Sequence, residues 1–534
     1  MIKMTPEETV RDYHQRTTHR FTGYAAGPDT LDWDAQPAPF RHFEGAEQIA
    51  LPAFSEIKNH ADLLKALTQP FQHIHDSTTQ PLTLASLGAL LHLALGITAW
   101  KNYGPDRWAV RANPSSGNLH PTEAYIVVAG MQDLADGVYH YRAETHALEK
   151  RADIQVSSPM FYIALTSVMW REAWKYGERA FRYCQLDTGH AIAALSYASA
   201  VLGWQLFEQS DISHAQLASL LGTQRLADFP FHRMAETELE EPEVLLHIAF
   251  GRKALKKTNL PVTTAFHGVA SAVDKHPMYH WLLVNTIAQA TQSTTAQPVP
   301  RQKISHSNTA HVPSKKSAAE VILGRRSAQR FDAHYVMPST IFFEILAQLQ
   351  ADKHAPWHTL SAPPHINLIF FIHRVEGLAP GLYLLPRVSR LSRILQNALD
   401  HRFLRQPVAS SQLQFLSPAP AAEFHRVTRS LHCHQDIAAT ACFSIGMLAE
   451  FDAVIQANPA AYRDLYREAG LIGQVLYLQA EVHGLRGTGI GCYFDDSVHN
   501  LLGLEGDTFK SMYHFTVSLP LEDSRIETLP TSII

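Results

Sequence analysis

The sequence predicts an α+β protein in which two related halves of one chain pair with each other. Three observations support this fold class. A polar segment near the middle separates two long regions, a helical sequence from the first region recurs in the second, and each copy is accompanied by runs typical of β-strands. Because helices and strands with one apolar face must bury that face, this pattern is typical of layered helices and sheets.

Length and composition indicate a folded protein with more than one domain. The chain has 534 residues, of which 46% are hydrophobic and 18% are charged. That is enough apolar material for large cores and too little charge for a disordered chain. With 45 basic and 50 acidic residues the net charge is −5, so we expect no nucleic-acid partner. The sequence predicts no membrane span and no signal peptide, and hence a cytoplasmic protein.

A change in composition marks the boundary between the halves. From Ala288 to Ser317 the chain is rich in Thr, Ser, Gln, Pro and Lys and has almost no large apolar side chains. Such a segment cannot bury enough surface to offset its ordering entropy. We therefore predict a first domain over residues 1–255, a linker with a possible short helical segment over 256–317, and a second domain over 318–534.

The two halves share a repeat without gaps. Residues 180–203 align with residues 461–484 at a constant offset of 281, as AFRYCQLDTGHAIAALSYASAVLG and AYRDLYREAGLIGQVLYLQAEVHG. Six of the 24 aligned pairs are identical, and both copies have the spacing of an amphipathic helix. A second, shorter similarity is found beside strand-like runs in each half, between GVYHY at 137–141 and GLYLL at 381–385. We interpret the two halves as an internal duplication.

A basic cluster opens the second half. Arg325, Arg326 and Ser327 lie in LGRRSAQRFD, where a turn precedes a helical run. Guanidinium groups bind phosphate oxygens in pairs of hydrogen bonds, and the hydroxyl adds another donor. The cluster is therefore a candidate phosphate site, although a solvated charged surface has the same composition.

A polar loop precedes a strand-like run in the first half. It reads RANPSSGNLHPTE from Arg111 onward and is followed by AYIVV. Pro114 and the glycine of the loop favour a tight turn, and Ser115, Ser116 and Asn118 supply donors and acceptors. A preorganised polar loop of this kind is a candidate binding loop for a planar heteroaromatic ligand. The alternative is an ordinary turn without a ligand.

These motifs resemble a known family. RRSAQRF is similar to the phosphate-binding signature of FMN-dependent nitroreductases, and PSSGNLHPTE closely resembles the flavin-contacting loop of their SagB/ThcOx-type dehydrogenase branch. YHQRTTH, LDWDAQPAPFRHF and WKYGERAFRYCQLDTGHA are similar to the same branch. The resemblance covers residues 13–250 strongly and residues 322–530 at the general nitroreductase level. It implies a nitroreductase-like fold in two tandem copies, forming an intrachain pseudo-dimer.

The resemblance also implies a composite FMN site. In homodimeric members one subunit supplies the Arg/Ser cluster and its partner supplies the PSSxN loop. Here each half keeps one part: at an offset of 256 the first half reads QPF where the second half has its Arg-Arg-Ser cluster, and the turn before the second-half strand reads SAPPHIN. We therefore expect one FMN per chain. The residues expected to bind it are Arg111, Pro114, Ser115, Ser116, Asn118, Arg325, Arg326 and Ser327.

A glycine-rich segment follows the second copy of the repeat. In HGLRGTGIGC, Gly489, Ile490 and Gly491 form a stretch where the backbone can approach a ligand closely, and the resemblance places this loop against the reactive edge of the flavin. The segment is not a G-x-G-x-x-G dinucleotide element, because Cys492 takes the last position and a helix precedes it. The resemblance also makes Arg525 a candidate second phosphate partner, with an exposed tail arginine as the alternative.

The candidate catalytic residues are Lys175 and Tyr176. The resemblance suggests this pair, because peptide-azoline dehydrogenases of the branch use an adjacent Lys-Tyr pair in proton abstraction. Oxidation by a flavin needs a base as well as a hydride acceptor, and a lysine in apolar or cationic surroundings can lose its proton near neutral pH. The alternative is a solvated lysine beside a core tyrosine. The second half has Gln456 and Ala457 at the equivalent positions.

The sequence predicts no metal site. Histidine is abundant, with 31 residues, and the densest cluster is His432-Cys433-His434. On a strand, its two histidines would share one face and its cysteine would point away, which is a poor three-ligand geometry.

The resemblance implies an FMN-dependent oxidoreductase that dehydrogenates a heterocyclic or peptide-derived substrate by hydride transfer to flavin N5. An NAD(P)H-dependent nitro or quinone reductase is the first alternative, with NAD(P)H as electron donor. The second alternative is a non-catalytic flavin-binding partner in a biosynthetic complex. We expect a small-molecule or peptide substrate and, among partners, the proteins of a biosynthetic cluster.

Overall fold

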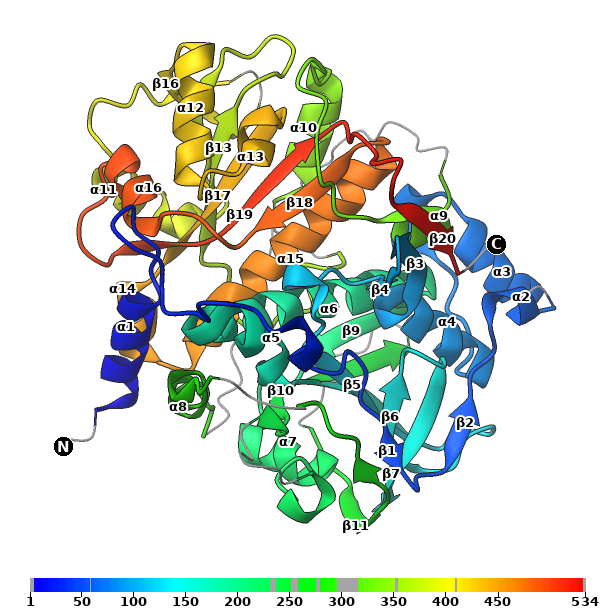
Figure 1. Cartoon of the computed structure of the whole chain (residues 1–534). Coiled ribbons are helices and arrows are strands. Elements are labelled where there is room, and N and C mark those ends of the chain that lie inside the picture. Colours follow the sequence, from blue (N-terminus) through cyan, green and yellow to red (C-terminus); the bar gives the residue numbers. More distant parts are fainter. Residues whose placement is uncertain are drawn as a thin grey trace.

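Two antiparallel sheets lie on either side of a central pair of long helices, α6 and α15 (Figure 1). A computed structural model describes residues 4–57, 59–230, 237–250, 258–274, 279–294, 316–350, 354–408 and 411–531.

The first-half sheet has the strand order β11-β7-β6-β5-β8-β10-β9, and β2 also pairs with β7. Neighbouring strands are antiparallel throughout this sheet. Its strands are β2 (Gln48–Ala50), β5 (Thr122–Ala129), β6 (Gly137–Arg142), β7 (Ala147–Gln155), β8 (Met160–Ser167), β9 (Trp204–Glu208), β10 (Glu241–Phe250) and β11 (Val262–Phe266). Two short strands, β1 (Phe43–Glu44) and β12 (Val269–Ala270), pair separately.

The second-half sheet has the order β15-β16-β14-β13-β17-β19-β18. Its strands are β13 (Ile366–Ile372), β14 (Gly381–Leu385), β15 (Gln406–Pro407), β16 (Gln414–Pro418), β17 (Phe443–Glu450), β18 (Arg486–Ile490) and β19 (Phe509–Ser518). The five strands β14-β13-β17-β19-β18 repeat the order of β6-β5-β8-β10-β9. The predicted duplication is therefore visible in both sheets as well as in the helices.

The helices of the first half are α1 (Pro6–Arg16), α2 (Phe54–Ile57), α3 (Ala61–Thr68), α4 (Leu84–Leu95), α5 (Met169–Tyr176), α6 (Ala180–Val201) and α7 (His214–Leu221). Helix α8 (Leu282–Ala290) follows in the region between the halves. The helices of the second half are α9 (Ala318–Gly324), α10 (Ser339–Gln348), α11 (Ser392–Ala398), α12 (Ala421–Leu431), α13 (Asp436–Thr440), α14 (Asp452–Ala457), α15 (Ala461–Val482) and α16 (Asp495–Leu502).

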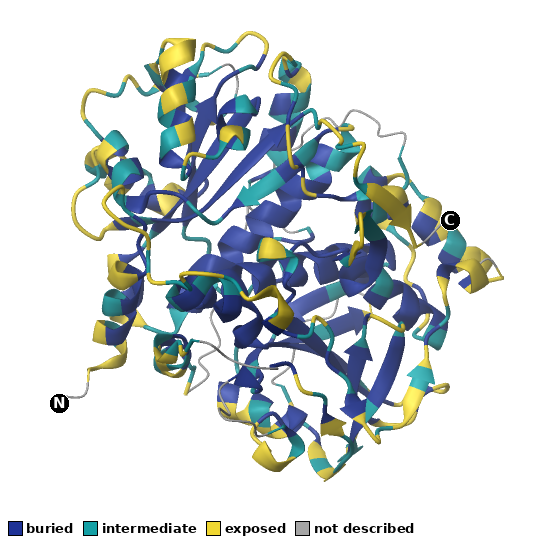
Figure 2. Ribbon diagram, in the orientation of Figure 1, coloured by how far each residue is buried: buried dark blue, intermediate teal, exposed yellow. Residues whose placement is uncertain are grey.

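The repeat helices α6 and α15 cross at two glycines. Both helices have 22 residues and begin and end at positions related by the offset of 281. A Cβ on Gly189 of α6 would lie 2.2 Å from the Arg467 carbonyl oxygen, and a Cβ on Gly470 of α15 would lie 2.1 Å from that of Leu186. The two clashes are equivalent under the repeat, so the crossing is a pseudo-twofold contact that requires glycine on both sides. Figure 2 shows that both helices are buried along their length.

Buried arginines at equivalent repeat positions join the halves. Arg182 of α6 binds Asp495 of the second half at 3.2 Å, and Arg463 of α15 binds Glu243 of the first half at 2.6 Å. Because losing one partner would leave a buried charge without compensation, each pair holds the two halves in a defined register. The prediction of two tandem copies that pair within one chain is confirmed.

The C-terminal segment of the second half pairs with a strand of the first half. Strand β20 (Glu527–Pro530), near the C-terminus, pairs with β3 (Ile97–Tyr103), which pairs in turn with β4 (Asp106–Arg111).

The first-half fold continues past the expected boundary at residue 255, because β11 joins the first sheet through β7. Residues 295–315, the most polar part of the predicted linker, lie outside the described residues.

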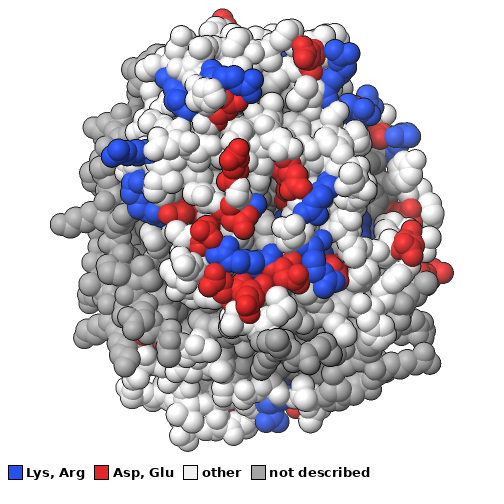
Figure 3. Space-filling view, turned by 90° about the vertical axis from the view of Figure 1, so that its left-hand side faces the viewer, with Lys and Arg blue, Asp and Glu red and all other residues white. Residues whose placement is uncertain are grey.

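The surface charges are mixed in sign on the face shown in Figure 3, where acidic and basic side chains lie next to each other. Some surface ion pairs join the two halves, as Arg11 does with Asp452 at 2.7 Å. Within the described parts of the chain, no helix combines the length and apolar character needed to cross a membrane.

Candidate functional site

A single cavity of about 360 Å³ brings together residues from both halves. Its volume lies within the range of roughly 300–1,000 Å³ that is usual for ligand pockets. Most of the predicted site residues line it, from the polar loop of the first half and from the basic cluster and glycine-rich segment of the second. These residues are Arg111, Pro114, Ser115, Ser116, Asn118, Tyr176, Arg325, Arg326, Ser327, Gly489, Ile490 and Gly491.

Hydrogen bonds within the polar loop and to neighbouring residues fix its conformation. The Ser116 amide and hydroxyl both donate to Asp187 of α6, at 3.1 and 3.2 Å to Oδ1. Asn118 donates from Nδ2 to the Ala109 carbonyl at 2.9 Å, and the His120 amide donates to Ser115 Oγ at 2.8 Å. Gly117, Asn118 and His120 all have positive φ angles. The loop is therefore fixed in a shape that these small and polar residues tolerate.

The predicted catalytic pair packs against this loop. A Cβ on Gly117 would lie 2.6 Å from the Tyr176 hydroxyl and 3.1 Å from Lys175 Nζ. Tyr176 lines the cavity, whereas Lys175 lies just behind the loop with its Nζ 6.0 Å from the centre of the Trp33 ring. Burial raises the pKa of Tyr176, and the Glu172 carboxylate adds to the rise. Tyr176 therefore keeps its proton at neutral pH.

Two buried carboxyl groups lie beneath the loop. Burial raises the pKa of Asp187 to about 7, against the hydrogen bonds from Ser115 and Ser116 that lower it. Burial also raises the pKa of Glu172, and the nearby Asp187 carboxylate raises it further. Two neighbouring carboxyl groups cannot both be negatively charged when they are buried away from water. The pair can therefore hold or release a proton near neutral pH within reach of the loop.

The basic cluster binds the backbone of the opposite half. Helix α9 ends at Gly324 and delivers Arg325 to the cavity, where Nε and Nη2 donate to the carbonyls of Ala112 (2.8 Å) and Arg111 (3.0 Å). Arg326 donates from Nη1 to Thr98 Oγ1 at 3.0 Å. Ser327 Oγ and the Tyr477 hydroxyl are 2.8 Å apart. The cluster is thus a junction between the halves as well as a cavity wall.

Hydrogen-bonding capacity remains at this end of the cavity. Nη1 of Arg325, Nε of Arg326 and Nε of Arg111 are buried without a hydrogen-bond partner among the described residues. Burial lowers the pKa of Arg326 to about 10, and the neighbouring Arg325 lowers it further. Burial likewise lowers the pKa of Lys101, another cavity residue, with Arg326 as the next cause. Crowded, partly unsatisfied cations of this kind favour binding of an anion.

At another part of the cavity wall, Gly489 of β18 and Gly491 just after it leave room for aromatic side chains. A Cβ on Gly489 would lie 1.7 Å from the Tyr513 hydroxyl, and a Cβ on Gly491 would lie 2.1 Å from Cε1 of Tyr183. The Gly489 amide donates to the Tyr477 hydroxyl at 3.1 Å. This part of the cavity is therefore walled by aromatic rings and bare backbone.

Arg525 does not join the site. Its side chain is 70% exposed and pairs with Asp523 at 2.7 Å, and its guanidinium lies 5.8 Å from the centre of the Tyr103 ring. Because this tail segment follows the outer surface beside β3, Arg525 is absent from the residues that line the cavity.

Sequence reasoning missed several cavity residues. Asp187 lies in the repeat helix and its repeat partner is Glu468, so the shared acidic position was an available signal. Tyr477 and Lys101 carried no local signal, because they reach the cavity only through packing between the halves.

The His432-Cys433-His434 segment follows α12 and has positive φ at Cys433 and His434, so it is not a strand. No cluster of three metal-ligating side chains is found in the part of the chain that the structure describes.

Comparison with known proteins identifies the family. The sequence profile of the Nitroreductase family matches residues 78–235 and 322–518, which together exceed half of the chain. The chain belongs to the Nitroreductase family. The two matched segments fall in the two halves, and the protein is accordingly an oxidoreductase of this family with two tandem copies of its domain.

Individual relatives agree with the family assignment. A protein named as a nitroreductase in Methanocaldococcus jannaschii is 27% identical over 170 residues, which cover 29% of this chain and 80% of that protein. The trifolitoxin-processing protein TfxB of Rhizobium leguminosarum bv. trifolii is 28% identical over 171 residues, 28% of this chain and 46% of TfxB. A crystal structure of a protein named as a nitroreductase from Anabaena variabilis has a TM-score of 0.69 at 21% identity, covering 96% of this chain and 99% of that one. That likeness establishes the fold.

Proposed function

We propose that this chain is an FMN-dependent oxidoreductase that dehydrogenates a heterocyclic or peptide-derived substrate. The observation that carries the proposal is the composite cavity, in which the polar loop of the first half faces the basic cluster of the second. The SagB/ThcOx-type resemblance of the loop supports the direction of the reaction. The name of the relative TfxB, a trifolitoxin-processing protein, supports a peptide-derived substrate and partner proteins from a biosynthetic cluster.

The residues present fit FMN. The unpartnered N–H groups of Arg325 and Arg326 would hold the phosphate, with Ser327 and Lys101 beside them. Ser116 and the bare backbone at Gly489 and Gly491 would hold the ring system, because all three line the same cavity. A Cβ at either glycine would displace Tyr513 or Tyr183 from its position there. When bound, FMN would supply two-electron chemistry through its N5.

The remaining steps belong to the side chains around the polar loop. We propose that Lys175 and Tyr176 act as a pair in removing a proton from the substrate, because Tyr176 lines the cavity and Lys175 Nζ lies beside the same glycine of the loop. Tyr176 then orients the substrate from the cavity wall. Asp187, whose pKa is about 7, would hold the Ser116 end of the loop in place and exchange a proton there.

The test is a visible absorption spectrum followed by a reaction with a defined probe. Protein purified with FMN should show a bound-flavin spectrum and should convert a thiazoline-containing model peptide to a product lighter by two hydrogen atoms, with any external acceptor reoxidising the flavin. Rapid bleaching by NADPH, with no oxidation of the peptide, would instead favour the nitro or quinone reductase. Bound flavin with neither reaction would favour a non-catalytic role.

A further inference from the structure

Two cysteines from separate segments meet at the cavity wall. Cys433 follows α12 and Cys492 follows β18, and their side chains hydrogen bond each other. Gln435 holds the two segments together, because its Nε2 donates to the carbonyls of His432 (3.0 Å) and Cys492 (3.1 Å). The Phe494 amide donates to the Leu431 carbonyl at 2.8 Å, which adds a second backbone connection. Both thiols are partly accessible, whereas Cys184 and Cys442 are buried.

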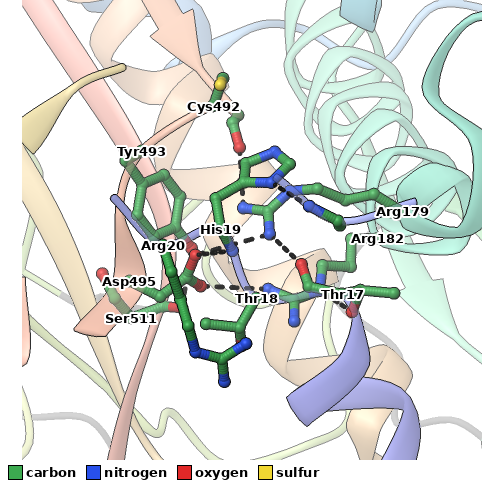
Figure 4. A network of polar contacts seen from close by, with 12 residues as sticks. Thr17, Thr18, His19, Arg20, Arg179, Arg182, Cys492, Tyr493, Asp495 and Ser511 are labelled. Atoms are coloured by element: carbon green, nitrogen blue, oxygen red, sulfur yellow. Dashed lines mark hydrogen bonds and ion pairs between the residues drawn. The ribbon is translucent and has the colours of Figure 1, made fainter. Parts of the chain in front are cut away.

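Cys492 lies beside the segment that follows α1 in the first half. Figure 4 shows His19 next to Cys492, and Arg179, Arg182 and Asp495 lie around His19. The Ala25 amide donates to His19 Nδ1 at 2.9 Å, so the proton of the neutral ring lies on Nε2, and the His19 side chain hydrogen bonds Cys492. Arg179 donates to the Gly491 carbonyl at 2.9 Å. His19, which follows α1, and Arg179, which precedes α6, thus place a hydrogen-bond donor and a positive charge near Cys492.

These contacts make Cys492 a thiolate at neutral pH. The hydrogen bond from Cys433 lowers the pKa of Cys492 to about 5, His19 and Arg179 add to the decrease, and burial opposes it. The same interaction raises the pKa of Cys433, which therefore keeps its proton. A partly exposed thiolate in electropositive surroundings is the reactive form of cysteine. The other titratable or charged groups that face this pair are Tyr24, Tyr176, Tyr183 and Asp495.

We propose that Cys433 and Cys492 form a redox-active dithiol that reacts with small-molecule disulfides and closes into an intrachain disulfide on the cavity wall. Cys492 is the attacking residue, because it lines the cavity and receives the hydrogen bonds from Cys433 and His19. Cys433 is the resolving residue. This activity is independent of the proposed dehydrogenation.

The exchange balances in two steps. The Cys492 thiolate attacks one sulfur of the small disulfide, its S–S bond breaks, and one thiolate leaves. The Cys433 sulfur then loses its proton, attacks Cys492 and releases the second small thiol. The chain is oxidised by two electrons and the small disulfide is reduced to two thiols. Once Cys492 is in a mixed disulfide, its negative charge no longer raises the pKa of Cys433, and the second step becomes easier.

The test uses the reduced full-length protein, as purified, with excess dithiodipyridine, a neutral disulfide that releases coloured thiopyridone. We expect two thiopyridones per chain, a protein lighter by two hydrogen atoms and no retained adduct. Peptide mapping should find the Cys433 and Cys492 peptides linked. The initial rate should be nearly independent of pH above about pH 6, because the pKa of Cys492 is about 5.

Variants separate the two roles. Cys433→Ser should release one thiopyridone and retain a stable adduct on Cys492, and Cys492→Ser should lose the fast reaction. Cys433→Ala removes the donor and should move the midpoint of the rate to higher pH than Cys433→Ser, which keeps a hydroxyl. The control variant Cys184→Ser should behave as the wild type. A persistent single adduct on the wild-type chain, or linkage of any other cysteine pair, would overturn the proposal, and the mapping decides this even if a variant fails to fold.

Discussion

The composite cavity and its pseudo-symmetric counterpart use the same fold for different purposes. In the counterpart, residues 69–71 replace the basic cluster, and Phe71 packs on Tyr197 with ring centres 5.7 Å apart. Strand β9 has Gln205 and Phe207 where β18 has Gly487 and Gly489. The first half thus has side chains at positions where the second half has glycines packed against Phe515 and Tyr513.

The carboxylates at equivalent repeat positions show the same contrast. Asp187 accepts hydrogen bonds from Ser116, and the structure gives it no arginine partner among the described residues. Glu468 accepts from the His365 amide at 2.7 Å and also binds the buried Arg387 at 2.9 Å. The ion pair fixes Glu468 as a structural anion. The two equivalent carboxylates thus differ in role: Glu468 belongs to a buried ion pair, whereas Asp187 lies beside the polar loop with a raised pKa.

The largest expected effect is the loss of FMN on removing the basic cluster. Arg325→Ala combined with Ser327→Ala should weaken FMN binding by at least about a hundredfold, because each hydrogen bond to a charged group contributes about 1.5–3 kcal/mol. Flavin absorbance after gel filtration measures this loss. Gln69→Ala, at the equivalent position of the first half, is the matched control and should retain the flavin. Equal flavin content in the double variant, with an unchanged melting temperature, would contradict the phosphate assignment.

The next effect concerns the pair that only the first half contains. Lys175→Ala should slow oxidation of the thiazoline peptide by about 10²–10⁴-fold, the usual contribution of a general base. Tyr176→Phe should have a smaller effect, because the hydroxyl acts as a donor. Both variants should retain FMN. Lys65→Ala, an exposed lysine on α3, is the control, and full activity of Lys175→Ala would remove this residue from the mechanism.

Substitutions of Gly489 in β18 and of Gly491 just after it test the space for the flavin ring. Gly489→Ala and Gly491→Ala should each reduce flavin affinity by roughly tenfold or more, because the new Cβ would displace Tyr513 or Tyr183, and overpacking costs about 1–3 kcal/mol. A fluorescence titration with FMN measures the change. Gly23→Ala is the control, since nothing lies within 4 Å of a Cβ there. Wild-type affinity in both glycine variants would show that the ring lies elsewhere.

The smallest effect is the pH dependence of stability that Asp187 contributes. Its pKa is raised from 3.8 to about 7 on folding, so its stabilising contribution is complete below about pH 4 and is lost as the pH rises through 7. The slope is at most about 1.4 kcal/mol per pH unit. Urea unfolding of Asp187→Asn should lack this slope. Glu468→Gln should instead destabilise the protein at every pH in the range, because Arg387 stays buried without its carboxylate. Parallel slopes in wild type and Asp187→Asn would refute the assignment.

The duplication could be predicted because its signal is local. A gapless repeat predicts two helices of equal length, and α6 and α15 begin and end at equivalent residues. The polar loop and basic cluster could likewise be predicted as site residues, since each is a short continuous motif. Their meeting in one cavity depends on the crossing of α6 and α15 at Gly189 and Gly470, which no single motif encodes.

Contacts between segments that are far apart in the sequence could not be predicted. Cys433 and Cys492 are separated by α13, β17, α14, α15 and β18, and their contact depends on how the segments after α12 and β18 pack. Arg525 shows the opposite error, because a family-like tail sequence does not determine whether the side chain turns inward. The expected domain end at residue 255 also missed β11, a short strand whose exposed residues resemble a polar linker.

The flavin content per chain tests the central claim most directly. Protein saturated with FMN, separated from free flavin and quantified by absorbance and amino-acid analysis, should contain one FMN per chain. That result is expected because the Arg-Arg-Ser cluster and the serine-rich loop meet once in the chain. Two FMN per chain would show that the counterpart position also binds flavin and would contradict the division of roles between the halves.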